Sequence, residues 1–353
     1  MSEIIFCMSM IMILGHLFRE SSKREVHYPQ LNPLLSINST SWGRTFWGTD
    51  ADKKEIEDTF IALSNRFKSP AIIGEWGLSG KSVEPGASWR YFDFFVRTTI
   101  KYKIAAQLWD NGGDHFDRLN HVWRDPVKLA ILQNAVKAVN NSIVSYGQEP
   151  VLYFAPGQAV NERSVNIDWN GNTLKNVRLG SETGKILKIC RDYTPTATGV
   201  TFSAGYLSSL ISTYPATQLG PLAKLWVIPS KGAAFPVSLT RNTLPTLSAT
   251  YFNVTDTSYP FIIPVANWEG STLATVQAIR KDGAILKDDW TQWLGPLEKG
   301  RLNWGDFEPK AAGVILSTSL LDTIKRSGQE VVLTLEFWPR VPGNNVTVAV
   351  RAL

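Results

Sequence analysis

Glu75 stands directly after an apolar run in the segment AIIGEWG, residues 71–77. The first residues of this segment predict a buried strand, and the glycine before the acid marks the strand's carboxyl end. In parallel α/β sheets the active site lies at that end, because loops can surround a substrate there while the strand holds each side chain. A carboxylate in this place can do catalytic chemistry, although pairing with an arginine or solvation at a turn explains it equally well.

Two further apolar runs also end in polar or aromatic residues. The segment REVHYP predicts a short strand that ends at His27 and Tyr28, and KIAAQLWDNGG predicts one that ends at Trp109 and Asn111. Since the carboxyl ends of parallel strands meet at one rim, we expect these side chains to lie near Glu75.

Helical segments separate these strands. Apolar residues recur at helical spacing in ADKKEIEDTFIALSNRF (51–67), SWRYFDFFVRTTIKY (88–102) and DPVKLAILQNAVKAVNN (125–141). The order strand, helix, strand, helix, strand, helix predicts a parallel sheet with flanking helices. Asp125 can cap the last helix, with Pro126 at its first position. The expected buried stripes are Ile56, Phe60, Leu63 and Phe67; Trp89, Phe92, Val96 and Ile100; and Leu129, Leu132, Val136 and Val139.

Taken in order, these segments resemble the last third of the catalytic barrel of glycoside hydrolase family 5, the endoglucanase-like enzymes. The resemblance covers roughly residues 24–140, and its most specific elements are Glu75 in IIGEWG and Trp109 in LWDNG. It implies a partial (β/α)8 TIM barrel of about the last three βα units.

The resemblance also implies a mechanism. Retaining glycosidases use two carboxylates about 5 to 5.5 Å apart, one as nucleophile and one as general acid and then base. Glu75 matches the nucleophile, and His27 and Tyr28 match a pair that lies against the nucleophile and the sugar. Trp109 matches the floor of the sugar site, because a flat ring suits the apolar face of a pyranose. We also count Trp76 and Asn111 among the substrate-binding residues.

The acid/base glutamate of the family has no match here. In the family it follows an asparagine at the end of strand four, whereas the Asn-Glu pair of this chain, Asn161-Glu162, lies beyond the barrel segment. Strands one to five have no match either, and three βα units cannot close a barrel. We therefore expect a shortened gene model or a genuine truncation, with poor or no hydrolysis of natural glycosides.

Beyond the barrel segment the pattern becomes all-β, and we expect four regions. Residues 1–23 form a leader, for which a signal core, a mistranslated segment and a structural role stay open; residues 24–142 form the truncated catalytic domain. Short strands and the Asn-Gly of DWNGNTL predict an immunoglobulin-like sandwich over 143–245, which resembles the spacer modules of cellulases. Residues 246–353 resemble the β-sandwich of carbohydrate-binding module family 46, with a hairpin turn at Lys281-Asp282-Gly283.

Tryptophans of the last region have two interpretations. In a small sandwich a tryptophan is more often core than ligand platform. Trp290 and Trp293 flank polar residues in a loop-like stretch, so we take them, with Trp304, as substrate-binding candidates. Trp338 has the same two interpretations, and Trp268 is a weaker candidate.

Composition limits the partners. The chain has 353 residues and a net charge of +5, and no run of lysine and arginine is interleaved with aromatics, so we expect no nucleic-acid partner. Its two cysteines, Cys7 and Cys190, support neither a disulfide framework nor a zinc site. We expect no cofactor, no metal and no membrane partner, and a monomer that acts on β-glucan or a related plant cell-wall polysaccharide. The family implies secretion.

Two functions remain open. The first is a retaining endo-β-1,4-glucanase that hydrolyses O-glycosyl bonds of β-glucan. The second is a non-catalytic remnant that binds glucan through its C-terminal β-sandwich, which the unmatched acid/base glutamate favours.

Overall fold

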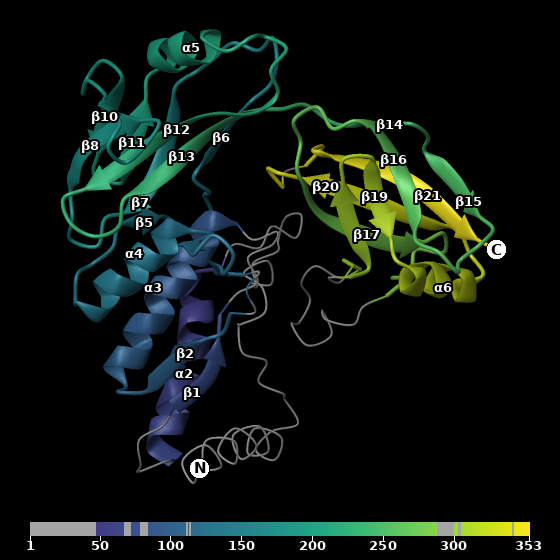
Figure 1. Ribbon diagram of the computed structural model, residues 1–353, viewed down its shortest axis with the longest axis horizontal. Helices are drawn as coiled ribbons and strands as arrows, with labels where there is room; N and C mark the ends of the chain where they lie inside the picture. Colours follow the sequence, from purple (N-terminus) through teal and green to yellow (C-terminus); the bar gives the residue numbers. More distant parts are fainter. Residues whose placement is uncertain are drawn as a thin grey trace.

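The chain folds around two hydrophobic cores (Figure 1). The structure, a computed structural model, describes residues 47–66, 72–77, 84–110, 112, 114–287, 300–302, 305–340 and 342–353. Buried residues between Trp47 and Leu239 form the first core, and those between Val254 and Ala352 form the second. The N-terminal α/β elements and the middle β-sheets therefore share one core.

The N-terminal unit contains a βαβ motif. The parallel strands β1 (Ile72–Trp76) and β2 (Ala105–Leu108) are joined through helix α3 (Pro85–Lys101). Helices α2 (Asp50–Arg66) and α4 (Pro126–Val136) flank the motif, and a small hairpin of β3 (Phe116–Asp117) and β4 (Val122–Trp123) lies between β2 and α4. The predicted helix-strand alternation is confirmed from α2 onward. The strand expected at His27 and Tyr28 lies outside the described residues.

The start of α4 agrees with the sequence, but its buried face does not. Asp125 caps the helix by accepting hydrogen bonds from the backbone N–H groups of residues 127 and 128, as predicted. The buried apolar residues are Val127, Ile131 and Ala135, whereas Val136 of the predicted stripe is 73% exposed. The helix carries two apolar rows, so spacing alone could not select the row that packs in the core. Ile100 of α3 is likewise exposed.

The middle unit consists of two sheets that contribute to the same core. One has the strand order β10-β11-β7-β5 and the other β6-β13-β12-β8-β9, with only the β13–β6 pairing parallel among the pairs within them. The strands are β5 (Ile143–Val144), β6 (Val151–Phe154), β7 (Arg163–Asp168), β8 (Leu174–Leu179), β9 (Lys185–Ile186), β10 (Tyr193–Thr196), β11 (Gly199–Phe202), β12 (Gly220–Pro229) and β13 (Phe235–Arg241).

Two details of this unit differ from the sequence pattern. Asn170 and Gly171 form the predicted turn with positive φ values, but the strands on either side, β7 and β8, belong to different sheets and do not pair. Within the region predicted to be all-β, the stretch after β11 is helix α5 (Ala204–Ser212), because the Ser203 hydroxyl accepts a hydrogen bond from Tyr206 N–H and starts a helical turn.

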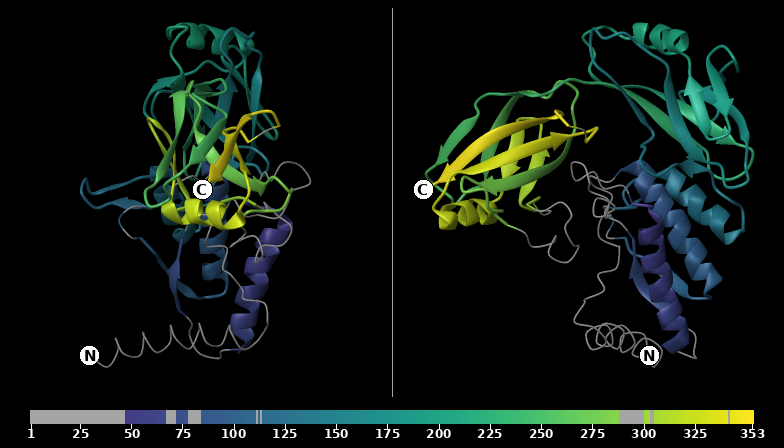
Figure 2. Two further views of the ribbon diagram at one scale, coloured as in Figure 1. Left: turned by 90° about the vertical axis from the view of Figure 1, so that its right-hand side faces the viewer. Right: turned by 180° about the vertical axis from the view of Figure 1, so that it is seen from behind.

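The C-terminal unit also has two sheets, β14-β16-β19-β18 and β15-β21-β20-β17, and a short helix, α6 (Thr318–Ser327). Figure 2 shows it to one side of the other two units. The turn predicted at Lys281-Asp282-Gly283 is confirmed by a hydrogen bond from Gly283 N–H to the Arg280 carbonyl, 2.8 Å. The strands are β14 (Thr246–Leu247), β15 (Tyr251–Val254), β16 (Phe261–Asn267), β17 (Leu273–Arg280), β18 (Phe307–Lys310), β19 (Gly313–Leu316), β20 (Val331–Phe337) and β21 (Asn345–Ala352).

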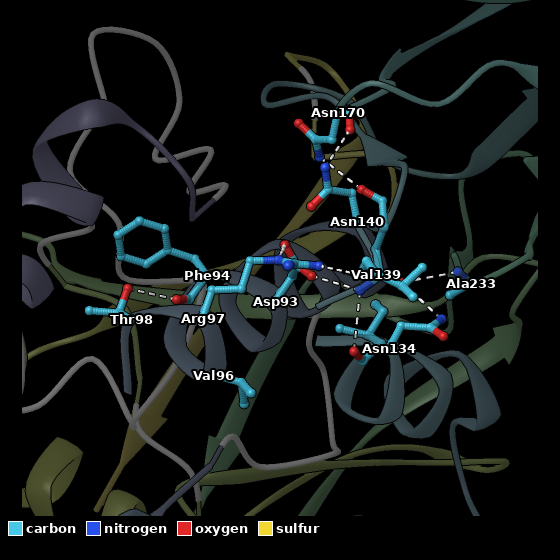
Figure 3. A network of polar contacts seen from close by, with 12 residues as sticks. Asp93, Phe94, Val96, Arg97, Thr98, Asn134, Val139, Asn140, Asn170 and Ala233 are labelled. Carbon is cyan, nitrogen blue, oxygen red and sulfur yellow. Dashed lines mark hydrogen bonds and ion pairs between the residues drawn. The ribbon is translucent and has the colours of Figure 1, made fainter. Parts of the chain in front are cut away.

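A buried amide joins the helices to the middle unit. Asn141 is fully buried, and its side-chain Nδ2 donates to Asp93 of α3 at 2.7 Å and to the Ile131 carbonyl of α4 at 3.2 Å. Its Oδ1 accepts from Asn134 of α4 and, at 3.0 Å, from the backbone N–H of Ala233 in the middle unit. Figure 3 shows the surrounding network. Every polar atom of this side chain is therefore used to connect elements.

An arginine and a glutamate reinforce the same junction. Arg90 of α3 is buried and donates to the carbonyls of Trp47, Val144 and Ser145. Glu149, from the segment between β5 and β6, accepts hydrogen bonds from the first N–H groups of α3, at 2.7 Å from Gly86 N. A carboxylate at a helix N-terminus satisfies orphan donors and complements the helix dipole. The middle unit thus caps α3.

We predict that Asn141→Ala lowers the free energy of unfolding by roughly 2 to 4 kcal/mol, because it leaves the Asp93 carboxylate and the Ala233 N–H buried without this partner. Chemical denaturation measures the change. Asn172→Ala is the matched control, since that amide also bonds across the junction, to the Asn140 carbonyl at 2.9 Å, from a more exposed position. Equal losses in both variants would contradict the role of burial.

Candidate active site

Glu75 and Trp109 lie at the carboxyl ends of adjacent strands. The backbone N–H of Trp109 donates to the Trp76 carbonyl at 2.7 Å, which ties the end of β2 to the end of β1. Glu75 is exposed, and the Trp109 side chain is 51% exposed. Glu75 and Trp109 are therefore both accessible near the carboxyl ends of neighbouring strands.

A register irregularity turns Glu75 outward. The pairing of β1 with β2 shifts between Ile73 and Trp76, and both of these residues are buried. In a regular strand, successive side chains point to opposite faces. Ile73 and Glu75 would then share the buried face, and Trp76 would point to the other face. The irregularity between Ile73 and Trp76 instead buries Trp76 and leaves Glu75 accessible, and bulges are frequent beside active sites.

Trp76 corrects one expectation. Its side chain is 3% exposed and its ring stacks on Phe95 of α3 with centroids 4.4 Å apart. It belongs to the aromatic core under the strand, so the sugar contact expected of it does not fit this structure. Its contribution is to anchor the strand that carries Glu75.

Gly77 lies in close contact with the turn after β2. Its φ is +155°, and a Cβ there would stand 3.1 Å from His115 Nε2 and 3.4 Å from the Trp109 carbonyl. A side chain would therefore push against both neighbours, which explains the glycine next to Trp76.

Asp110 organises the backbone that follows Trp109. Its carboxylate accepts hydrogen bonds from the N–H groups of Gly112, His115 and Phe116, at 3.0, 2.9 and 3.3 Å. Burial opposes ionisation, but these hydrogen bonds and the nearby Arg118 hold the pKa of Asp110 below its ordinary value. Asp110 stands in the sequence between the two predicted site residues Trp109 and Asn111, and its hydrogen bonds reveal its own structural role.

His115 lies buried behind the strand ends. It is 2% exposed, and neither ring nitrogen has a hydrogen-bond partner among the described residues. Its ring meets Phe92 edge to face with centroids 5.3 Å apart. Burial, followed by the positive charge of Lys128, lowers the pKa of His115 to about 4, so the imidazole is neutral at pH 7. The sequence analysis did not single it out.

Of the other candidate site residues, the structure describes Trp268 and Trp338. Trp268 is half-buried, and its indole N–H donates to the carbonyls of Lys310 and Ala311, which makes it structural. Trp338 is half-buried at the end of β20. His27, Tyr28, Asn111, Trp290, Trp293 and Trp304 lie outside the described residues.

Two features are absent from the residues that the structure describes. No cluster of three or more His, Cys, Asp or Glu residues there could hold a metal ion. No helix in that part of the chain has the length and apolar character needed to cross a membrane.

The chain is similar to endoglucanases of known sequence and structure. The chain is 32% identical over 250 residues to Endoglucanase B of Paenibacillus lautus, which covers 68% of this chain and 41% of that protein. A tri-modular family 5 (subfamily 4) endo-β-1,4-glucanase from Bacillus licheniformis, solved with cellotetraose, is 30% identical and superposes with a TM-score of 0.76 over 88% of this chain and 58% of that one. The chain is related to the glycoside hydrolase family 5 endoglucanases. The resemblance inferred from Glu75 and Trp109 is thereby confirmed.

The fold match extends to a second solved relative. The tri-modular endo-β-1,4-glucanase B from Bacillus halodurans, 23% identical, superposes with a TM-score of 0.69 over 88% of this chain and 57% of its own. Multidomain organisation is thus confirmed. The chain spans 41% of the length of Endoglucanase B and 58% and 57% of these two enzymes.

A family match identifies a carbohydrate-binding module. Residues 151–238 match the family described as Carbohydrate binding domain X2. The match falls on the middle unit, for which the sequence predicted an immunoglobulin-like spacer. The family 46 module expected over 246–353 remains a prediction.

We predict that acid destabilises the chain through His115. The unfolded-state pKa of histidine is about 6.5 and the folded-state pKa of His115 is about 4, so the unfolded chain binds the proton first. Stability is therefore lost as pH falls from about 6.5 toward 4, by at most roughly 3 kcal/mol from this residue. Urea unfolding at a series of pH values measures the loss.

His115→Phe should flatten this part of the profile, whereas the exposed His121→Phe should leave it as in the parent chain. An unchanged slope in His115→Phe would show that another group carries the pH dependence.

Proposed function

We propose that the chain binds β-glucan and carries the nucleophile half of a retaining endo-β-1,4-glucanase site. The observation that carries the proposal is that Glu75 and Trp109 are both exposed near the carboxyl ends of adjacent parallel strands. The ring of Trp109 would support a pyranose while the Glu75 carboxylate attacks its anomeric carbon. The printed names of the endoglucanase relatives support this substrate class.

The remaining elements fit the end of a family 5 barrel. We propose that β1, α3, β2 and α4 correspond to its seventh and eighth βα units, with α2 as the helix before them. The parallel β1–β2 pair and the helix between them support this assignment. The assigned region then ends where Asn141 joins α4 to the middle unit.

Hydrolysis of natural glucan needs a second carboxylate, and we assign no residue of this chain to that role. A general acid must protonate the leaving oxygen. In retaining glycosidases the carboxyl group of this acid lies about 5 to 5.5 Å from that of the nucleophile. The Asn161-Glu162 pair directly precedes β7 in the middle unit, and we do not assign it to the site. We propose that the described residues alone bind glucan and hydrolyse it poorly or not at all.

A glucan-binding role without catalysis is the second candidate. The match of residues 151–238 to a carbohydrate binding domain favours it, because that unit is complete in the structure with both of its sheets. We propose a monomer that acts outside the cell, where polymeric glucan is found.

We predict that a dinitrophenyl fluoro-cellobioside labels Glu75. In this reagent fluorine replaces the hydroxyl next to the anomeric carbon. The carboxylate would form a C–O bond to that carbon while the bond to dinitrophenolate breaks, and this leaving group departs with the electron pair without needing an acid. Peptide mass spectrometry should show one cellobiosyl adduct on the peptide containing Glu75.

Two variants make the labelling specific. Glu75→Gln should abolish the adduct, and Glu162→Gln, an exposed acid in the middle unit, should keep it. If the parent chain stays unlabelled while calorimetry shows that it binds cellotetraose, the nucleophile assignment is wrong and the binding role stands. If it binds no cellotetraose either, the whole proposal is wrong.

A further inference from the structure

A cavity of about 330 Å³ lies where the three units of the chain meet. Its walls include Glu84 at the start of α3, Gln148 and Tyr153 of the middle unit, and Trp338 of the C-terminal unit. The end of β20 and the start of β21 lie on the side of the C-terminal unit that faces the rest of the chain (Figures 1 and 2). Trp338 reaches the cavity from that end.

Hydrogen bonds hold the wall supplied by the C-terminal unit in place. The Trp338 carbonyl accepts a hydrogen bond from Asn242 Nδ2 at 3.4 Å, and the Trp338 N–H donates to the Thr272 carbonyl at 3.0 Å. Ser271 Oγ donates to the Thr243 carbonyl at 2.7 Å across the same link between the units. The aromatic wall is therefore part of an ordered contact between units.

The polar wall presents hydrogen-bonding groups with fixed orientation. Gln148 Oε1 accepts from Asn166 N–H at 2.6 Å, which leaves its Nε2 group as a donor with no partner among the described residues. Ser164, also on the wall, shares a hydrogen bond with Thr201 at 2.8 Å, so its hydroxyl keeps hydrogen-bonding capacity. Tyr153 lies on the outward-facing side of β6, opposite the buried Leu152 and Phe154.

The charges around the cavity argue against an anionic ligand. Glu84 and Glu149 are among the lining residues, and the buried Arg90 lies 3.7 Å from Glu149. A phosphate or carboxylate would meet two acids and a guanidinium that already has a partner. A neutral, hydroxyl-rich ring with an apolar face fits the aromatic and amide groups best.

We propose that this cavity is a second glucan subsite, separate from Glu75 and Trp109, that holds a glucosyl unit between Trp338 and Tyr153. Its hydroxyls would bond to Gln148 and Ser164. The proposal rests on glucan binding as the function of the chain and adds a place for the polymer at the meeting point of the units. Binding there would also bridge the C-terminal unit to the other two.

Fluorine NMR of the full chain labelled with fluorotryptophan tests the proposal, with cellotetraose as the ligand. The signal of Trp338, assigned from Trp338→Phe, should shift in a saturable way, and Trp226, half-buried on β12 and outside the cavity, should not respond. In calorimetry, Ser164→Ala should weaken this binding event by roughly two- to tenfold. Trp338→Phe should weaken it by at least about tenfold.

The outcomes separate the two proposals. A shift of Trp109 alone would overturn the junction subsite and leave glucan binding at the strand ends in place. A chain in which no tryptophan signal responds would overturn both. If the Trp338 signal shifts but Ser164→Ala binds cellotetraose with full affinity, the assigned hydroxyl contact is wrong. Loss of affinity in both Ser164→Ala and Trp338→Phe would establish the subsite.

Discussion

The buried amide of Asn141 is the interaction on which the arrangement of this chain depends. In the part of the chain that the structure describes, the N-terminal helices and strands share one hydrophobic core with the middle sheets. Asn141 connects α3 and α4 to the backbone of the middle unit through hydrogen bonds made by both polar atoms of its side-chain amide, Oδ1 and Nδ2. Since a buried amide left without partners is costly, this geometry specifies one docking position.

The docking of α3 on the middle unit determines the positions of Glu75 and Trp109. Trp89 of α3 packs its ring on Phe235 of β13, and Glu149 caps the same helix, so α3 is held by the middle unit along its first turns. Helix α3 in turn supports β1 through the stack of Phe95 on Trp76. The exposed positions of Glu75 and Trp109 thus follow from a series of contacts that begins in the middle unit.

The sequence predicted the features that are local. The strand before Glu75, the helix α3 and the cap at Asp125 each depend on residues close together in the chain, and each is present. The burial predicted for the strand holds for Ile73, whereas Ile72 is exposed. The failures involve contacts between distant segments. The inward turn of Trp76 comes from a register shift, and the buried row of α4 is the one that packs on α3. A lone asparagine after a helix carries no signal for a role such as that of Asn141.

Hydrogen exchange measured by mass spectrometry tests the shared fold of helices and middle sheets most directly. The account predicts that amides of α3 and of β13 open with similar free energies, and that Asn141→Ala lowers protection in both while leaving α6 and β20 of the second core unchanged. If α3 lost protection in Asn141→Ala while β13 kept its full protection, the two would be independent folding units, and the account would be contradicted.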